Sequence, residues 1–275
     1  MLKARLVTAF LLILLAVWAV FSLGTSWFAG VTATFLLIGA WEWAGLSRLD
    51  SAGARFAYVT AVAAAALAAF GLRGGMIADV LIGVAVAWWI GAAALVGACE
   101  SGLVRRAHFY GPAAGLAGLL VLIPAWFSLV LLHGAAAGRQ MLMFLFLLVW
   151  SADSAAFLAG RRWGRTPLVP AISPGKTREG VCAALAAGAA LALGFAVLKG
   201  MDVDEMLVFT ALSLVTVLAS VLGDLVESML KRSVGRKDSG ALLPGHGGVL
   251  DRIDSLTAAG PVFLAGLWMM DRWLP

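Results

Sequence analysis

The sequence predicts an all-α fold, a polytopic integral membrane helix bundle of about nine transmembrane helices with its N-terminus in the cytoplasm. Of the 275 residues, 62% are hydrophobic and only 13% are charged, whereas soluble domains carry roughly 25% charged residues. The apolar residues form runs of about 20, which is the length that crosses a bilayer. The charged residues gather in short segments between these runs. We therefore expect a single membrane domain over residues 1–275.

Nine apolar runs are long enough to be spans. They fall at roughly 6–23, 27–46, 55–72, 76–98, 111–133, 139–160, 180–199, 206–230 and 255–273. The first run follows Lys3 and Arg5, as in a signal peptide. It is longer than a signal core and a second span follows at once, so a retained helix is favoured.

The distribution of Lys and Arg sets the orientation, because cytoplasmic loops are enriched in these residues. With a cytoplasmic N-terminus, 16 of the 20 Lys and Arg residues fall on the inner side of the membrane and 4 on the outer side. The same asymmetry explains the net charge of +5 without nucleic acid as a partner. We expect a protein of the inner (cytoplasmic) cell membrane.

Two inner loops, 161–179 and 231–254, stand out by their length and charge, whereas every outer loop is short. Chemistry is therefore expected at the cytoplasmic face. Both loops belong to residues 139–275, which we expect to hold the catalytic helices and loops. Residues 1–133 are expected to form N-terminal hydrophobic helices.

Asp224 and Glu227 lie in the eighth predicted span, where ionisable groups are costly and often functional. They are three residues apart and share one helix face, which Lys231 continues. Two adjacent carboxylates repel each other unless a cation lies between them, and hard divalent cations bind carboxylate oxygens. The pattern favours a metal site. The alternative is a salt bridge from Glu227 to Lys231, which leaves Asp224 unpaired.

Three further acids fall within predicted spans. Asp79 lies near an outer helix end, where a solvated or capping role is favoured. Glu42 lies near the inner boundary, where a snorkelling or paired carboxylate is the usual interpretation. Asp153 lies near the inner end of the sixth span, between Ser151 and Ser154, and is a functional candidate.

The loop 231–254 combines basic groups, acids and glycines. Its candidate residues are Lys231, Arg232, Lys237 and Arg252 as cations, Asp238, Asp251 and Asp254 as carboxylates, and His246, Gly247 and Gly248 in a GHGG turn. Free backbone N–H groups in glycine-rich turns suit phosphate oxygens. His246 either binds phosphate or maintains the loop shape. With Asp224 and Glu227, these acids form a carboxylate cluster of the kind found in metal-dependent phosphoryl or nucleotidyl transfer.

Two alternatives remain at these loops. Asp251 or Asp254 could cap the ninth helix, whose N-terminus favours negative charge. In the segment SPGKTREG (173–180), phosphate contacts are expected from Ser173, Lys176, Thr177 and Arg178. A polybasic loop that meets anionic lipid headgroups is the alternative. A P-loop is rejected, because that motif needs a glycine where Pro170 stands.

The segment SMLKRSVGRKDSGALLPGHGGVLDRID (228–254) resembles the signature of phosphatidate cytidylyltransferases, the CDP-diacylglycerol synthases. The upstream GDLVES, the SPGKTREG loop and the ADSAAFLAGRRWGR segment also resemble that family. The similarity covers about the last 130 residues. The first half matches only as a set of hydrophobic spans.

The resemblance implies that CTP and phosphatidic acid of the inner leaflet are converted to CDP-diacylglycerol and diphosphate, with magnesium, at the cytoplasmic face. It implies a multi-helix protein among membrane lipids and a homodimer. The family's metal-binding carboxylates match Asp224, Asp251, Asp238 and Asp254, and its essential basic residues match Lys231, Arg232 and Lys237. A second cation, K+, beside the Mg2+ has been described in the family.

Other classes of protein share parts of this pattern. A secondary transporter would use buried acids for coupling, but its site is expected near the midplane and often between repeats. Here the charge gathers at one face, and we find no repeat. A lipid kinase or another CTP-using transferase has similar parts. A non-enzymatic assembly factor has no need of a carboxylate cluster beside basic, glycine-rich loops.

Overall fold

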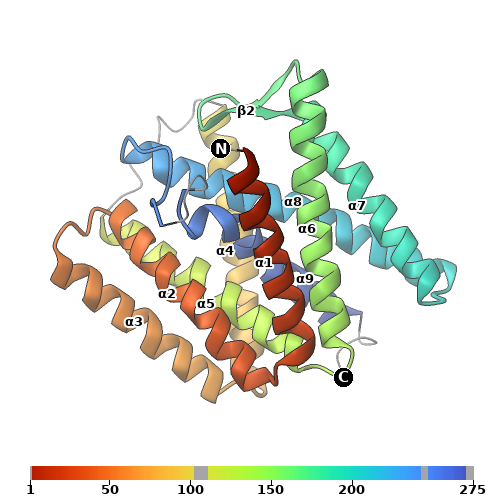
Figure 1. The fold of residues 1–275 in the computed structure, drawn as a ribbon, viewed down its shortest axis with the longest axis horizontal. Coiled ribbons are helices and arrows are strands. Elements are labelled where there is room, and N and C mark those ends of the chain that lie inside the picture. Colours follow the sequence, from red (N-terminus) through yellow and green to blue (C-terminus); the bar gives the residue numbers. More distant parts are fainter. Residues whose placement is uncertain (1, 102–110, 243–246, 271–275) are drawn as a thin grey trace.

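A computed structural model describes residues 2–101, 111–242 and 247–270. Over these residues the fold is a bundle of nine α-helices with one small β-hairpin (Figure 1). The helices are α1 (Leu2–Ser22), α2 (Thr25–Leu46), α3 (Ala52–Gly71), α4 (Met76–Glu100), α5 (Pro112–Gly134), α6 (Gly138–Trp163), α7 (Arg178–Leu198), α8 (Val203–Ser233) and α9 (Leu250–Met269). The predicted all-α class is confirmed for the bundle itself.

Seven of the described helices are long and apolar enough to cross a membrane. They are α2, α3, α4, α5, α6, α7 and α8. Helix α1 contributes a shorter apolar stretch, Ile13–Ser22. Helix α9 begins at Leu250, before the predicted start at 255, and its first two turns carry Asp251 and Asp254. An integral membrane protein is therefore supported.

The loop predicted at 161–179 is not irregular throughout. Strand β1 (Pro167–Val169) pairs antiparallel with β2 (Ser173–Thr177). The amide of Ile172 donates to the carbonyl of Val169 at 3.1 Å and closes the turn. A proline in each strand is tolerated because both strands are edges, which have unpaired sides. The sequence predicts only helices and loops, so this hairpin is not anticipated; it lies across the top of the bundle in Figure 1.

Helix α8 is 31 residues long, about 46 Å at 1.5 Å per residue. Its start is fixed by a capping box: Asp202 accepts from the amide of Glu205 at 2.9 Å, and Glu205 accepts from the amide of Asp202 at 3.1 Å. Its last turn contains Lys231 and Arg232, where positive charge complements the helix dipole. These two residues, predicted in a loop, are therefore helical.

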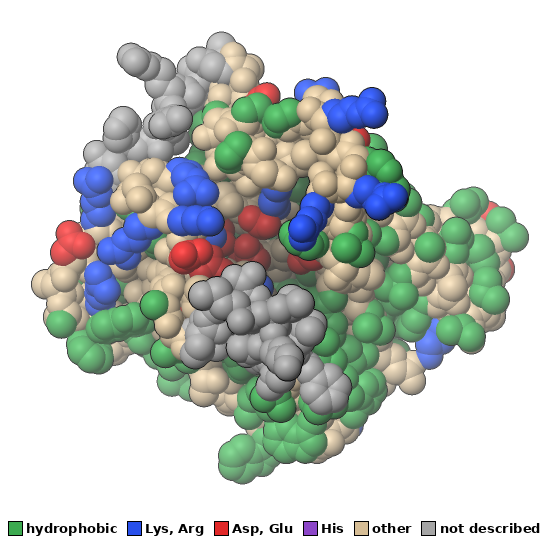
Figure 2. Space-filling model, turned by 45° about the horizontal axis from the view of Figure 1, so that its top comes forward, with side chains coloured by type: hydrophobic (Ala, Val, Ile, Leu, Met, Phe, Trp, Pro, Cys, Tyr) green, Lys and Arg blue, Asp and Glu red, His purple; other side chains and the backbone are tan. Residues whose placement is uncertain are grey.

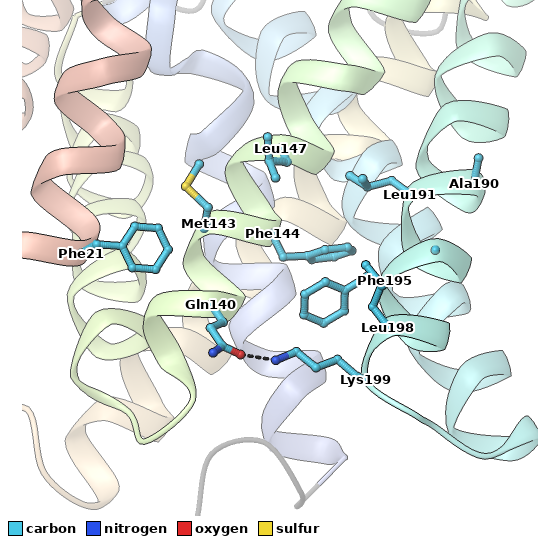
Figure 3. A pocket seen from close by; sticks show the side chains of 11 residues that line it. Phe21, Gln140, Met143, Phe144, Leu147, Ala190, Leu191, Phe195, Leu198 and Lys199 are labelled. Carbon is cyan, nitrogen blue, oxygen red and sulfur yellow. Dashed lines mark hydrogen bonds between the residues drawn. The ribbon is translucent and has the colours of Figure 1, made fainter.

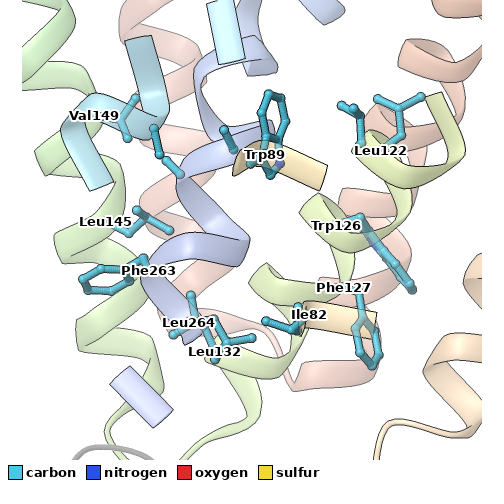
Figure 4. Close-up of a cluster of buried hydrophobic side chains, with 14 of the residues drawn as sticks. Ile82, Trp89, Leu122, Trp126, Phe127, Leu132, Leu145, Val149, Phe263 and Leu264 are labelled. Carbon is cyan, nitrogen blue, oxygen red and sulfur yellow. The ribbon is translucent and has the colours of Figure 1, made fainter. Parts of the chain in front are cut away.

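The core surrounds α9, which packs against α4, α5, α6 and α8. Figure 4 shows part of this cluster, with Trp89 of α4, Leu122 and Trp126 of α5 on one side of α9, and Phe263 of α9 on the side of α6. Phe144 of α6 and Phe263 have ring centroids 5.9 Å apart. Burial of these large apolar side chains fixes α9, and with it the position of its N-terminus.

Helices α2 and α3 are fixed to α5 by polar contacts from aromatic residues. The indole N–H of Trp43 donates to the carbonyl of Ala114 at 2.7 Å, and the hydroxyl of Tyr58 donates to the carbonyl of Gly115 at 2.9 Å. Gly118 lies against both rings, so a methyl group there would collide with them. The N-terminal helices thus pack rigidly against the core.

An apolar groove of about 440 Å³ lies between α1, α6 and α7. Figure 3 shows its rings, Phe21, Phe144 and Phe195, and its polar rim, where Lys199 donates to the side chain of Gln140. The rim lies beside Gly138, the first residue of α6, whereas the hairpin follows Trp163 at the other end of that helix. The groove is therefore remote from the charged face described below.

Candidate active site

Acidic side chains gather in a hollow on one face of the molecule, with Lys and Arg side chains around them (Figure 2). The elements that meet there are the C-terminal half of α8, the first turns of α9 and strand β2. These elements carry most of the residues predicted from the sequence. The fold thus brings the segments 161–179 and 231–254 together.

The centre of the hollow is a cluster of Asp224, Glu227 and Asp254. Each offers a carboxylate oxygen, and these three oxygens all lie within 4.8 Å of one another. Asp224 and Glu227 share a face of α8, and Asp254 approaches from α9. The approach is close because Gly223 has no side chain: a Cβ there would lie 2.5 Å from the carbonyl oxygen of Asp254.

Two lysines neutralise part of this charge. Lys176 of β2 lies 2.7 Å from Asp224. Lys231 lies 2.9 Å from Glu227 and 2.5 Å from Asp251. The salt bridge between Glu227 and Lys231 therefore exists, and Asp224 is also paired. The first outcome is the alternative weighed from the sequence, but Asp224 is not left unpaired as that alternative expected, because Lys176 reaches it from the other loop.

The carboxylate cluster fits a divalent cation. The Oε1 atom of Glu227 is buried and has no hydrogen-bond partner among the described residues, which is costly for a carboxylate oxygen. Lys231 binds the other oxygen of this group. An all-oxygen set of three carboxylates is the donor chemistry that hard divalent ions prefer. An ion bound here would satisfy the orphaned oxygen of Glu227.

Asp251 lies beside this cluster in a separate network. Its Oδ2 atom accepts from the amide of Ser239 at 3.0 Å, from the hydroxyl of Ser239 at 2.8 Å and from the amide of Gly248 at 2.8 Å. Burial would raise the pKa of Asp251, but Lys231 and these donors hold it below its usual value. Asp251 therefore joins Ser239 to Gly248, on the two described sides of the loop.

The other residues of the 231–254 loop lie around the hollow. Arg232, Lys237, Asp238 and Arg252 are exposed. Arg232 donates to the carbonyl of Arg236 at 3.1 Å. A Cβ at Gly247, whose φ is +80°, would lie 2.7 Å from Asp251 Oδ2 and 3.5 Å from the Cβ of Asp238. The loop therefore needs glycine at this position. His246 lies outside the described residues.

The predicted residues of 173–178 have different roles in the structure. Of Ser173, Lys176, Thr177 and Arg178, only Lys176 forms a salt bridge with an acid of the hollow in the described part of the chain. Thr177 caps α7 by accepting from the amide of Gly180 at 3.1 Å. Ser173 begins β2 and is half-buried, and Arg178 opens α7 with an exposed side chain. These three remain candidates for substrate contact.

Three polar side chains near the site received little weight from the sequence. Glu42 of α2 is buried and accepts hydrogen bonds from the start of α9. Ser239 joins Glu42 to Asp251. Ser255 donates to Asp153 at 3.3 Å, which places Asp153 beside α9. The sequence signal for Glu42 was an acid within an apolar run, near the predicted inner boundary of a span. Nothing in the sequence indicated its partners.

Comparison with known proteins agrees with this geometry. The model of the cytidylyltransferase family matches residues 3–270. The chain is 40% identical to a phosphatidate cytidylyltransferase of Pseudomonas aeruginosa, over 98% of this chain and 97% of the relative. It is 37% identical to a protein of the same name from Haemophilus influenzae, over 96% and 97%. A relative of that name from Brucella suis is 46% identical over 54% and 53%.

Proposed function

The chain belongs to the cytidylyltransferase family, and we propose that it makes CDP-diacylglycerol and diphosphate from CTP and phosphatidic acid. The observation that carries the proposal is the carboxylate cluster of Asp224, Glu227 and Asp254 beside Lys176 and Lys231. Relatives that carry the name phosphatidate cytidylyltransferase match nearly the whole chain. The reaction serves phospholipid biosynthesis.

The reaction is a displacement at phosphorus. A phosphate oxygen of phosphatidic acid attacks the α-phosphorus of CTP, the bond from that phosphorus to the β-phosphate oxygen breaks, and diphosphate leaves. Both reactants are polyanions, so their mutual repulsion is the first obstacle. Catalysis then rests on positioning and charge neutralisation, and no covalent enzyme intermediate is required.

Asp224, Glu227 and Asp254 would hold a divalent cation, which we propose to be Mg2+. Asp251 and Asp238 are also proposed as ligands: Asp251, in the first turn of α9, is joined to the cluster through Lys231, and Asp238 lies in the preceding loop. When bound, the ion would neutralise the triphosphate and polarise its phosphoryl oxygens. A second cation such as K+ rests on the family resemblance.

The basic residues are proposed to bind the phosphates. Lys176 and Lys231 each contact a carboxylate of the site, so both amino groups already point into the hollow. Arg232, Lys237 and Arg252 are exposed around it and can reach a leaving diphosphate or a lipid phosphate. Arginine and lysine at such positions offset developing negative charge.

Backbone and hydroxyl groups complete the proposed substrate site. The N–H groups of the glycine-rich turn suit phosphate oxygens, with His246 beside Gly247 and Gly248 in the sequence. Ser173, Thr177 and Arg178 on the hairpin side are proposed to contact the substrates as well. Lys176, on the same strand as Ser173 and Thr177, lies beside Asp224, which supports the proposal for the hairpin side.

We propose that the hollow faces the cytoplasm, with about nine membrane-crossing helices and the N-terminus inside. Sixteen of the 20 Lys and Arg residues then lie on the inner side. In Figure 1, α1 begins at the end of the bundle that carries the hairpin. The acyl chains stay in the inner leaflet while the headgroup meets soluble CTP. We also propose that the protein is a homodimer. Within each chain, residues 1–133 are proposed to form N-terminal hydrophobic helices and residues 139–275 the catalytic part.

The test uses purified protein with labelled CTP, Mg2+ and either phosphatidic acid or a neutral lipid alcohol. Labelled liponucleotide and diphosphate, formed only with phosphatidic acid, are expected. Release of CDP with a phosphorylated lipid alcohol would instead identify a lipid kinase. Absence of any CTP turnover with either lipid would contradict the enzymatic assignment.

A further inference from the structure

Glu42 is a buried carboxylate far from the signature residues in the sequence. It lies on α2, near its C-terminal end, and is only 7% exposed. Its Oε1 atom accepts from the amide of Val249 at 3.1 Å, and its Oε2 atom accepts from the amide of Leu250 at 2.8 Å. These two amides start α9, and an ionised carboxylate is favourable at a helix N-terminus.

The same carboxylate extends into the catalytic loop. The hydroxyl of Ser239 lies 3.1 Å from Glu42 Oε2 and 2.8 Å from Asp251 Oδ2. Asp251 in turn binds Lys231, which binds Glu227. Glu42 therefore stands at one end of a continuous chain of polar contacts, and the carboxylate cluster stands at the other.

The loop is shaped around Glu42. A methyl group at Gly240 or at Gly248 would collide with its carboxylate. Two loop glycines thus lie against the carboxylate: Gly240 directly follows Ser239, and Gly248 directly precedes the N-cap residue of α9. Backbone N–H groups held this way cannot turn toward solvent without leaving Glu42 buried and unpaired, which is costly.

We infer that Glu42 is a positioning residue for the reaction: through the start of α9 and Ser239 it fixes the orientation of Asp251 and of Gly248. This gives the N-terminal helices a part in the active site. Glu42 touches neither the carboxylate cluster nor Lys231 directly. The predicted effect of Glu42 on kcat rests on the proposed function.

The test compares Glu42→Gln with Trp43→Phe, a matched control. Val249 and Leu250 donate to different oxygens of Glu42, so in glutamine one of these two amides would face an NH2 group, which is a donor. Trp43 is the next residue of α2 and is equally buried, but its indole bonds to Ala114 of α5. Its substitution removes an interhelical hydrogen bond without touching the loop.

Two readouts are used on the full-length protein in lipid nanodiscs. The kcat for liponucleotide formation is expected to fall roughly 10- to 100-fold in Glu42→Gln, since small misplacements of reacting groups cost about that much. Hydrogen exchange of the amides at 249 and 250 is expected to rise about tenfold, as for the loss of one charge-assisted hydrogen bond. Trp43→Phe should change neither.

Ser239→Ala provides an independent check, because it keeps the helix contacts of Glu42 and removes only the hydroxyl that joins Glu42 to Asp251. It should also lower kcat, and its effect should shrink in the Glu42→Gln background, since the two residues act through one contact. If Glu42→Gln does not fold, Ser239→Ala decides alone.

Turnover within twofold of wild type in Glu42→Gln, unchanged exchange at 249 and 250, or an unaffected Ser239→Ala would each overturn the inference. The exchange measurement needs no turnover. A wild-type protein without liponucleotide synthesis would therefore refute the proposed function and leave this inference testable.

Discussion

At the scale of single residues, the site is a balance of opposite charges. Asp224 keeps one oxygen 2.7 Å from Lys176 and accepts from the hydroxyl of Ser228 at 3.2 Å with the other. Its side chain is still 31% exposed. Asp224 is therefore accessible from the hollow, so a metal ion bound to it could also contact an incoming phosphate. Lys176, beside it, is a cation that the phosphate can bind.

Asp224→Asn should reduce liponucleotide synthesis by at least about 100-fold, a loss comparable to that of one electrostatic group that stabilises a transition state. The amide keeps the volume of the side chain but removes the charge that balances a cation. The measurement is the initial rate at saturating CTP and Mg2+. Asp79→Asn is the control, because Asp79 is exposed in the first turn of α4.

The two variants should reach the membrane in equal amounts. Near-normal turnover in Asp224→Asn would contradict the assignment of this carboxylate to the reaction. Equal losses in Asp224→Asn and Asp79→Asn would also contradict it, because a general loss of negative charge would then be the cause.

At the scale of elements, the cluster depends on the contact between α8 and α9. Gly223 makes this contact possible: besides the carbonyl of Asp254, a Cβ there would lie 3.3 Å from Thr257 Oγ1 and 3.4 Å from the Cβ of Ala258. Backbone atoms of α9 cannot rotate away as a flexible side chain can. The spacing between Asp224 and Asp254 is thus set by the absence of one methyl group.

Gly223→Ala should push α9 away from α8. The free energy of unfolding should fall by about 1–3 kcal/mol from overpacking, and the activation free energy of the reaction should rise by more than this. Gly194→Ala is the matched control, since a Cβ there meets nothing within 4 Å and alanine favours the helix. Thermal unfolding in detergent measures the first effect. An unfolding temperature of Gly223→Ala at or above that of Gly194→Ala would show that the helices are not in contact here.

How far the sequence predicts these elements depends on the distance between partners. The spacing of Asp224 and Glu227 on one helix predicts their shared face, because helical period is a local property. No such period relates Lys176 to Asp224, or Glu42 to Leu250 on α9, because these pairs meet only through tertiary packing. The hairpin at 167–177 is missed because its prolines and glycine are typical of loops.

Helix ends show the same limit. The apolar run ends near residue 230, yet α8 continues to Ser233, because Lys231 and Arg232 are favourable in a last turn. Likewise, α9 begins at Leu250 because Glu42, on a distant helix, satisfies its first amides. A boundary read from hydropathy marks where lipid contact ends, and a helix can go further when tertiary partners satisfy its polar groups.

At the scale of the whole molecule, the asymmetry of charge predicts how the bundle lies in the membrane. Helix α8 is about 46 Å long, so its two ends can reach opposite faces of a bilayer. Its first turn carries Asp204 and Glu205, and its last turn carries Lys231 and Arg232. From the positive-inside rule we expect the Lys231 end, and with it the hollow, to be cytoplasmic.

Single cysteines at the two ends of α8 test this orientation. Asp204 and Arg236 are both exposed, so Asp204→Cys and Arg236→Cys should not disturb the fold once Cys99 and Cys182 are replaced by serine. In intact cells a membrane-impermeant maleimide should label Asp204→Cys, whereas Arg236→Cys should be labelled only after the cells are opened. Labelling of Arg236→Cys in intact cells would place the carboxylates on the outer face, where cytoplasmic CTP could not reach them.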